Sequence, residues 1–191
     1  MRKSIYACVL VTLLVGSAFA GELLVNGGFE SGVLSPWYNA RDFCGFTCVP
    51  WNVSNANPHS GSFSAMDVGN IELRQDFTPT PGSMITSVSF WVNSSAGVDA
   101  VDFFYTDNSD EEFVVFSTPG VWNLADVTAD VDTGKTLSGF SIWGADPGFT
   151  TFVDDASIMA NMATTPEPGT LVMLGSGALA LAGALRRKIN L

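Results

Sequence analysis

The chain has 191 residues, of which 47% are hydrophobic and 14% are charged, and its formal net charge is −11. Between residues 21 and 165 only three cations stand against 18 carboxylates, which gives this segment a formal net charge of −15. Such a surface repels nucleic acid and anionic membranes, because binding to either depends on neutralising phosphates with Lys and Arg. A nucleic-acid-binding function is therefore excluded, and a soluble, acidic exported domain is favoured.

The first 20 residues have the three parts of a secretory signal peptide. Arg2 and Lys3 are followed by an apolar stretch, residues 5–15, and then by Ser-Ala-Phe-Ala at 17–20. A charged start, an apolar centre and a small-x-small cleavage site are typical of export signals. We predict a signal peptide at 1–20 and a folded domain at 21–163, which is long enough to bury a core.

The segment 21–163 shows no helical periodicity. Instead it holds short runs rich in β-branched and aromatic residues, separated by Gly, Pro, Asn and Asp. Turn signals recur roughly every 8–12 residues, the spacing expected of an all-β sandwich. In the run 84–93, Val88, Phe90 and Val92 share one face, which predicts the core side of a strand. About nine strands are expected, at 22–26, 62–66, 71–77, 84–93, 101–105, 113–116, 122–127, 137–143 and 150–159.

Two cysteines remain once the signal peptide, with Cys8, has been removed. Cys44 and Cys48 stand four residues apart, and a close pair in an exported protein favours a disulfide that pins a loop. The alternative is a metal site, but this would need further soft ligands, and the chain has a single histidine. A bridge over so short a loop would shape a local surface more than it would stabilise the fold.

Catalytic motifs are missing from the sequence. The single histidine, His59, lies in a turn-like stretch, and there is no Gly-x-Ser-x-Gly elbow, no His-Glu-x-x-His and no nucleotide fingerprint. A glycosidase needs only two carboxylates, and an acidic chain always contains such pairs, so they discriminate nothing. A non-catalytic protein is predicted.

The C-terminal end combines three features in order. Pro-Glu-Pro at 166–168 precedes an uncharged apolar run, residues 169–185, and a cationic cluster follows at 186–188. The run is close to the lower limit for a membrane-spanning helix, about 17–25 residues. The prolines cannot continue a helix backwards, and the cations would hold the far end in the cytoplasm. We predict a tail at 164–191 with one transmembrane helix at 169–185.

This tail resembles the PEP-CTERM sorting signal of Gram-negative bacteria. The residues that carry the resemblance are Pro166, Glu167, Pro168, Arg186 and Arg187. The resemblance implies processing by exosortase, a membrane protease-transpeptidase, after transient membrane insertion. It also implies export to the cell surface or matrix, in connection with extracellular polysaccharide and biofilm. The alternative reading of the tail is an ordinary C-terminal anchor helix.

The folded segment resembles the galactose-binding-like jelly rolls, a β-sandwich class that includes many carbohydrate-binding modules. The opening run Leu-Leu-Val-Asn-Gly-Gly-Phe-Glu-Ser-Gly at 23–32 looks like their first strand and turn. Later landmarks follow in the expected order, and together they span nearly the whole domain. They are Trp37, residues 61–65, 73–77, 81–82 and 88–92, and the closing run 152–158.

The resemblance implies a structural calcium ion. Glu30, Asp154 and Asp155 match the ligand positions of the family, and calcium takes six to eight oxygens from carboxylates and carbonyls. Which aspartate points inward stays open, because Asp154 shares parity with Phe152 while Asp155 shares it with Val153. In the alternative, Glu30 caps the glycine-rich turn and both aspartates are exposed.

Sugar binding in such folds relies on exposed aromatic rings. Trp37, Tyr38 and Trp51 lie in the irregular stretch 35–57 and are the candidate carbohydrate-binding residues, although packing in the end of the sandwich is the favoured role of Trp37. For the tryptophans in or beside predicted strands, packing in the core or on a sheet face is favoured: Trp91, Trp122 and Trp143.

These observations predict an exported, non-catalytic protein that binds carbohydrate or extracellular polymer. The chief alternative is a structural matrix or adhesion protein without a small ligand, and the third is a secreted hydrolase. A glycan binder should expose two or more aromatic residues on one face or loop rim, whereas a structural module should bury them. A hydrolase should place His59 or a carboxylate pair in a cleft.

Overall fold

The computed structural model describes residues 19–42, 49–162, 175–177 and 186. Residues 20–162 form one compact unit. The predicted cysteine bridge and nearly all of the predicted signal peptide and transmembrane helix lie outside the described residues, although 175–177 are helical. In the part of the chain that the structure describes, no helix has both the length and the apolar character needed to cross a membrane.

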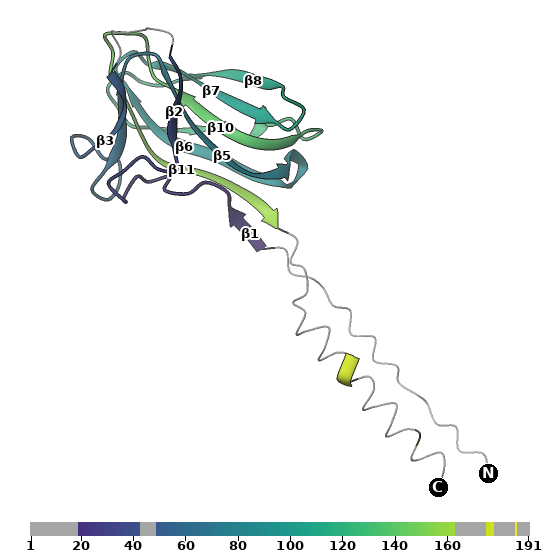
Figure 1. The fold of residues 1–191 in the computed structure, drawn as a ribbon. Coiled ribbons are helices and arrows are strands. Elements are labelled where there is room, and N and C mark those ends of the chain that lie inside the picture. The colour runs from purple at the N-terminus through teal and green to yellow at the C-terminus, as the bar shows by residue number, and fades with distance from the viewer. Residues whose placement is uncertain (1–18, 43–48, 163–174, 178–185, 187–191) are drawn as a thin grey trace. The chain divides into compact units, whose positions relative to one another are not determined.

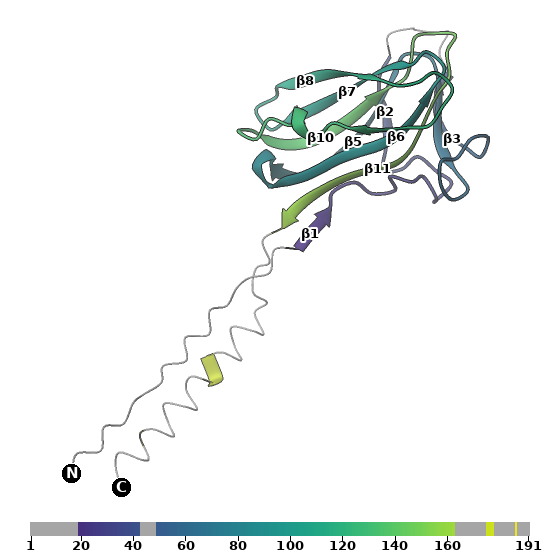
Figure 2. The same ribbon diagram turned by 180° about the vertical axis from the view of Figure 1, so that it is seen from behind.

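Within the described residues, eleven strands form two sheets, which Figures 1 and 2 show as separate layers. Sheet A is six-stranded, and its main path runs β3 (Val49–Ser54), β4 (Ser64–Val68), β11 (Thr151–Met162), β6 (Ile85–Ser94) and β9 (Asn123–Asp126), with β1 (Phe19–Glu22) also paired to β11. Sheet B runs β2 (Tyr38–Asp42), β5 (Ile71–Pro81), β10 (Thr136–Trp143), β7 (Val98–Tyr105) and β8 (Asp110–Phe116). Short 3₁₀ turns lie at Gly82–Met84 and Thr128–Asp130. The predicted all-β sandwich is confirmed.

The core lies between the two sheets and follows the alternation of their strands. Val88, Phe90 and Val92 are fully buried, as their shared face predicted. The ring of Phe140 lies 6.1 Å from that of Phe90 in the opposite sheet and 5.5 Å from that of Phe103. Burial of each such side chain contributes about 1.5–3 kcal/mol, so this aromatic cluster is a main source of stability.

Two strands were not predicted, β2 and β3. All five residues of β2 are exposed, so no alternation of polar and apolar residues marks it. Strand β3 contains Pro50 and lies at the edge of sheet A, where a missing backbone N–H is tolerated. The stretch predicted to be irregular therefore supplies an edge strand to each sheet.

The opening strand ends earlier than predicted, at Glu22. After this strand, the backbone groups of Val25 form hydrogen bonds with a side-chain amide and not with the backbone of a neighbouring strand. Its N–H donates to Oε1 of Gln75 at 2.7 Å, and its carbonyl accepts from Nε2 of Gln75 at 2.9 Å. The buried amide of Gln75 thus takes the place of a neighbouring strand.

Candidate functional site on the outer face of sheet B

The outer face of sheet B carries charged and aromatic side chains in cross-strand register. Leu73 and Ile142 point into the core, so their neighbours along the strands point outward. Tyr38 pairs with Arg74, and Trp143 pairs with Glu72. The members of this face, called here the B face, are Tyr38, Arg41, Glu72, Arg74, Asp76, Ala100, Asp102, Phe104, Glu112, Val114, Ser141 and Trp143.

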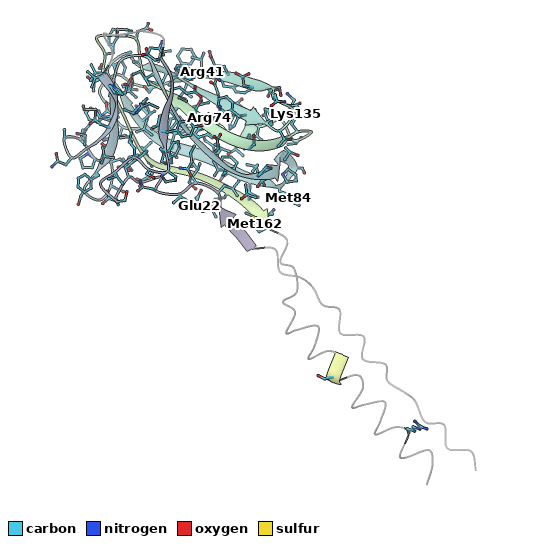
Figure 3. The ribbon with its side chains drawn as sticks, in the orientation of Figure 1. Glu22, Arg41, Arg74, Met84, Lys135 and Met162 are labelled. Carbon is cyan, nitrogen blue, oxygen red and sulfur yellow. The ribbon has the colours of Figure 1, made fainter. Side chains whose placement is uncertain are left out.

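Two arginines lie over one aromatic ring at the centre of the B face. The guanidinium carbon of Arg74 lies 3.6 Å from the Phe104 ring centroid, and that of Arg41 lies 5.4 Å from it. The Arg41 guanidinium is also 5.9 Å from the Trp143 ring centroid. Figure 3 labels both arginines on this side of the sandwich. Cation–π contact holds the planar guanidinium groups flat and leaves their edges for hydrogen bonding.

Carboxylates fix the positions of these side chains. Arg74 pairs with Asp76 at 2.7 Å, and Asp76 also accepts the Tyr38 hydroxyl at 2.7 Å. Burial and the hydrogen bond to Asp76 raise the pKa of Tyr38 to about 12, so its hydroxyl stays protonated. Arg41 pairs through Nε with Glu72 at 3.0 Å. Burial raises the pKa of Glu72, while the Ser141 hydroxyl and the Arg41 charge oppose this shift.

Two hollows open on the B face. The acidic hollow, of about 410 Å³, is lined by Asn70, Ala96, Val98, Asp99, Ala100, Glu112, Val114, Trp143, Gly144, Ala145 and Asp146. The arginine hollow, of about 380 Å³, is lined by Arg41, Arg74, Phe104, Tyr105, Thr106, Asn108, Ser109, Asp110 and Ser138. Each combines an aromatic ring with several polar groups, which is the make-up of small-ligand sites.

The structure separates the three predicted carbohydrate-binding residues. Tyr38 is 40% exposed on the B face, whereas Trp37 and Trp51 are 3% and 2% exposed. The Trp37 ring packs 5.8 Å from that of Phe29, and the Trp51 indole N–H donates to the Ile71 carbonyl at 2.7 Å. The assignment of Trp37 and Trp51 to a sugar-binding surface is therefore wrong, because both rings lie in the core.

Sequence reasoning missed the arginines and Phe104. The signal was present, because Arg74 lies between the core residues Leu73 and Gln75, and Phe104 lies between Phe103 and Tyr105. Strand alternation alone puts both side chains on the outer face. Their contact could not be predicted, since β5 and β7 meet only through β10.

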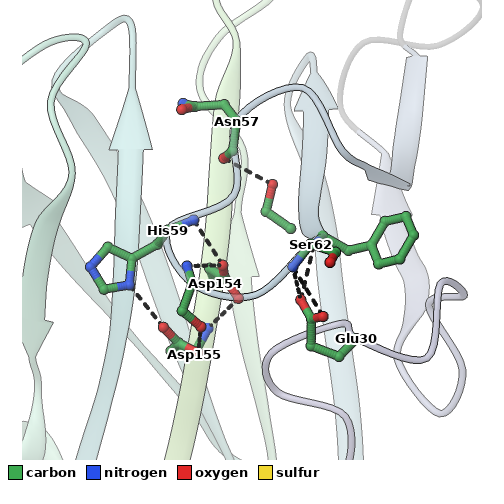
Figure 4. Close-up of polar contacts among 9 residues, drawn as sticks. Glu30, Asn57, His59, Ser62, Asp154 and Asp155 are labelled. Atoms are coloured by element: carbon green, nitrogen blue, oxygen red, sulfur yellow. Dashed lines mark hydrogen bonds and ion pairs between the residues drawn. The ribbon is translucent and has the colours of Figure 1, made fainter.

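Glu30, Asp154 and Asp155 bind one loop, residues 59–63 (Figure 4). Glu30 accepts the backbone N–H groups of Ser62 and Phe63, both at 2.9 Å. Oδ2 of Asp154 accepts the backbone N–H groups of residues 59 and 60 at 2.9 and 3.1 Å. The three predicted calcium ligands therefore do come together. The alternative prediction was that Glu30 caps the glycine-rich turn. In the structure Glu30 instead accepts hydrogen bonds from the loop 59–63, which is distant in sequence.

The three carboxylates surround Gly28. A Cβ at this position would lie 3.4 Å from Oδ1 of Asp155, 3.8 Å from Oδ1 of Asp154 and 3.9 Å from Cγ of Glu30. Asp154 is the buried member of the aspartate pair, while Asp155 has a φ of 49° and a 35% exposed side chain. Burial raises the pKa of Asp154, and the N–H groups of Ser60 and Asp155 oppose this shift.

This donor set suits a hard cation, because three carboxylates meet where Gly28 leaves room. As the side chains lie, however, no three Asp, Glu, His or Cys residues in the described part of the chain gather closely enough to hold a metal ion. Their oxygens face N–H and O–H donors of the 59–63 loop instead. Calcium at Glu30, Asp154 and Asp155 stays a prediction.

His59 is part of the same loop. Its ring stacks on Trp91, with 3.9 Å between centroids, and Nδ1 lies 2.8 Å from Oδ2 of Asp155. The neighbouring Ser60 hydroxyl donates to Asp155 at 2.8 Å and not to His59. These residues therefore do not form the nucleophile and base pair that a serine hydrolase requires.

Residues 164–188 match the PEP-CTERM protein-sorting motif. The match spans Pro166, Glu167, Pro168, Arg186 and Arg187, so the predicted sorting signal is confirmed. It indicates an exported protein that is sorted at the membrane. A sequence comparison with curated proteins found no match.

Several solved structures similar to this chain are carbohydrate-binding modules. TmCBM61 in complex with β-1,4-galactotriose is 24% identical to this chain, with a TM-score of 0.54. The match covers 73% of this chain and 99% of that chain. A family 16 carbohydrate-binding module is 14% identical, with a TM-score of 0.50, 71% of this chain and 98% of that chain covered. The CBM22-1-GH10 modules of Clostridium thermocellum xylanase 10B with xylohexaose are 14% identical, with a TM-score of 0.51, 74% of this chain and 29% of that chain covered. The likeness shows that the sandwich has the fold of carbohydrate-binding modules.

Proposed function

We propose that this exported protein binds carbohydrate on the B face without catalysing a reaction, and that its ligand is an extracellular polysaccharide. The observation that carries the proposal is the stack of Arg74 on Phe104, at 3.6 Å, in the lining of the arginine hollow. Sugar sites combine an apolar ring surface with a few fixed hydrogen-bonding groups. The fold shared with carbohydrate-binding modules supports the same assignment.

The polar side chains of the B face are held in fixed positions by one another, which supports binding more than catalysis. Asp76 holds Tyr38 and Arg74, and Asp102 accepts the Trp143 indole N–H at 2.9 Å. These groups are positioned before a ligand arrives, so little conformational entropy is lost on binding. Hydroxyl groups of a sugar would meet guanidinium and carboxylate edges whose geometry is already set.

The C-terminal motif bears on where the protein is processed and where it is delivered. We assign an exosortase-type protease-transpeptidase as the processing partner and the surface or matrix of a Gram-negative bacterium as the destination. Deletion of residues 166–191 should abolish sorting, so that the protein is released or stays in the periplasm. Fractionation and immunoblotting would show this, and unchanged surface retention of the truncated protein would contradict the sorting role.

A structural matrix or adhesion role is the second candidate. The observation that favours it is the burial of Trp37, Trp51, Phe104 and Trp143, all at 7% exposure or less. Tyr38 is the only ring of the B face with large exposure among the described residues. A module without a small ligand is expected to bury its aromatic residues.

Glycan-array binding of the purified full-length chain separates the two candidates. A Tyr38→Ala/Arg74→Ala variant should lose binding, because it removes the exposed ring and the stacked guanidinium of the B face. Leu124→Ala is a suitable control, since Leu124 is 56% exposed on strand β9 of the other sheet. Absence of binding to every glycan by a folded chain would favour the structural role.

A further inference from the structure

The outer surface of sheet B continues past the B face to an exposed aromatic ring, that of Phe116. Val98 on β7 pairs with Phe116 on β8. Two residues along the same strands, Ala100 pairs with Val114 on the B face. Val115 lies between Val114 and Phe116 and is buried in the core, so strand alternation turns both of its neighbours outward. Phe116 therefore lies on the same side of the sheet as the B face.

Phe116, Val98 and Val114 form an apolar surface, called here the Phe116 platform. Phe116 is 78% exposed, Val114 is 54% exposed and Val98 is 45% exposed. Val98 and Val114 also line the acidic hollow, together with the Trp143 ring, so the platform borders a space of about 410 Å³. Isolated exposed apolar residues are common on protein surfaces, whereas several adjoining ones indicate a surface that binds something.

The charge of the β8 edge argues against a second copy of this chain as the partner. Residues 110–112, in the same strand as Phe116, are all acidic, and residues 21–165 carry a formal net charge of −15. The backbone of an edge strand can pair with another strand, but two edges of this charge would repel each other. An uncharged partner meets no such repulsion.

A neutral sugar fits both the platform and the hollow beside it. The apolar side of a pyranose ring can lie on the Phe116 platform, while carboxylates of Glu112 and Asp146 accept hydrogen bonds from its hydroxyl groups. No Lys or Arg is among the described residues that line this hollow, so an acidic sugar would find no ion-pair partner there. The chemistry of the surface therefore favours a neutral glycan.

Phe116 and Tyr38 lie at opposite edges of sheet B. Tyr38 belongs to β2 and Phe116 to β8, the two outermost strands of the sheet, which Figure 1 labels. The cross-strand row that starts at Tyr38 ends at Glu112, four residues before Phe116. Four strand spacings of about 4.8 Å and four residues of about 3.4 Å separate the two rings by about 23 Å along the sheet. Short oligosaccharides, up to a trimer, do not reach both rings, whereas an extended hexamer does.

We propose that the Phe116 platform is a second sugar-stacking subsite, and that the ligand is a neutral, extended polysaccharide whose chain runs across sheet B from Tyr38 to Phe116. The inference deepens the proposed function and rests on it. Because both rings contact one chain, the loss of translational and rotational freedom on binding is incurred only once. Affinity should therefore depend on the length of the glycan.

The test compares ligands that differ only in length. The full-length chain in mild detergent is titrated calorimetrically with trimers and hexamers of β-1,4-linked glucose, xylose and galactose, all of them uncharged. The best-bound hexamer should bind about tenfold more tightly than its trimer, as expected for one additional aromatic contact. Phe116→Ala should remove most of this preference, and Phe116→Tyr should retain it because the ring is kept.

A matched control removes an exposed apolar side chain elsewhere. Leu124, on β9 of the other sheet, is 56% exposed, and Leu124→Ala should keep the full preference for the hexamer. Equal binding of trimer and hexamer, or an unchanged preference in Phe116→Ala, would overturn the inference. Loss of that binding in Tyr38→Ala/Arg74→Ala would then leave the proposed function standing.

The remaining outcomes also decide between the proposals. Binding of acidic glycans alone on the array would overturn the assignment to a neutral polysaccharide and leave glycan binding standing. No binding of any glycan would overturn both the inference and the proposed function. A parent chain that is dimeric in sedimentation equilibrium, and monomeric as Phe116→Ala, would assign the platform to contact between copies and overturn the inference.

Discussion

The guanidinium group of Arg74 is stacked on the ring of Phe104, with 3.6 Å between the guanidinium carbon and the ring centroid. Asp76 holds the same guanidinium at 2.7 Å. In a domain with few cations, this places a hydrogen-bonding plane on the outer face of sheet B, in the lining of the arginine hollow. The relationship links residues from β5 and β7, which are not neighbours in the sheet.

Arg74→Ala should weaken glycan binding and lower the free energy of unfolding by about 0.5–2 kcal/mol, since a cation–π contact is lost. Arg74→Lys should recover part of the stability but little of the binding, because an ammonium group cannot replace the planar fork. Calorimetric titration and chemical unfolding measure the two effects separately. Full binding by Arg74→Ala would show that the stack plays no part in recognition.

Gln75→Ala should lower the free energy of unfolding by about 1–3 kcal/mol, because both backbone groups of Val25 would lose their partner. Urea denaturation followed by tryptophan fluorescence measures this change. Ser83→Ala, at an exposed position outside any strand, serves as the control and should change stability by less than about 0.5 kcal/mol. A loss no larger than that of the control would mean that the amide does not anchor the opening segment.

Stability should fall with rising pH because of Asp67. Burial raises the pKa of Asp67 from 3.8 to about 8, with the N–H groups of Val68 and Gly69 opposing the shift. Between these values the folded state binds more protons than the unfolded state, so the unfolding free energy decreases by up to about 1.4 kcal/mol per pH unit.

Asp67→Asn should remove this dependence between about pH 4 and 8. Denaturant midpoints of the parent and the variant, measured across that range, would show the difference curve. Parallel curves for the two proteins would rule out a raised pKa of Asp67. Asp130→Asn, at a half-buried turn position, is the control for a general change in charge.

Calcium should stabilise the full-length chain if Glu30, Asp154 and Asp155 bind it. At a concentration about 100 times the dissociation constant, the gain would be about 2.7 kcal/mol. Glu30→Gln should abolish the calcium-dependent rise in melting temperature, because it removes one of the three charges around Gly28. Melting curves with calcium and with chelator make the comparison. Identical curves for the parent chain would contradict the calcium prediction.

Much of the fold could be predicted because its signals are local. The face shared by Val88, Phe90 and Val92 follows from a repeat of two residues, and all three are fully buried. The same alternation placed strands at 71–77, 101–105 and 137–143, all of which the structure contains. The sorting motif could also be predicted, because it is a contiguous stretch of sequence whose parts occur in a fixed order.

The sequence by itself determined the fold class, the export route and the absence of a known catalytic motif, since each depends on composition, period or a contiguous motif. Only the tertiary structure decided the site. It buried Trp37 and Trp51, left Tyr38 exposed, chose Asp154 as the buried aspartate and brought Arg74 to Phe104. Those outcomes depend on which strands pair and in what register. Strand pairing is a non-local choice that hydrogen bonds and core packing make together, and no stretch of the chain encodes it alone.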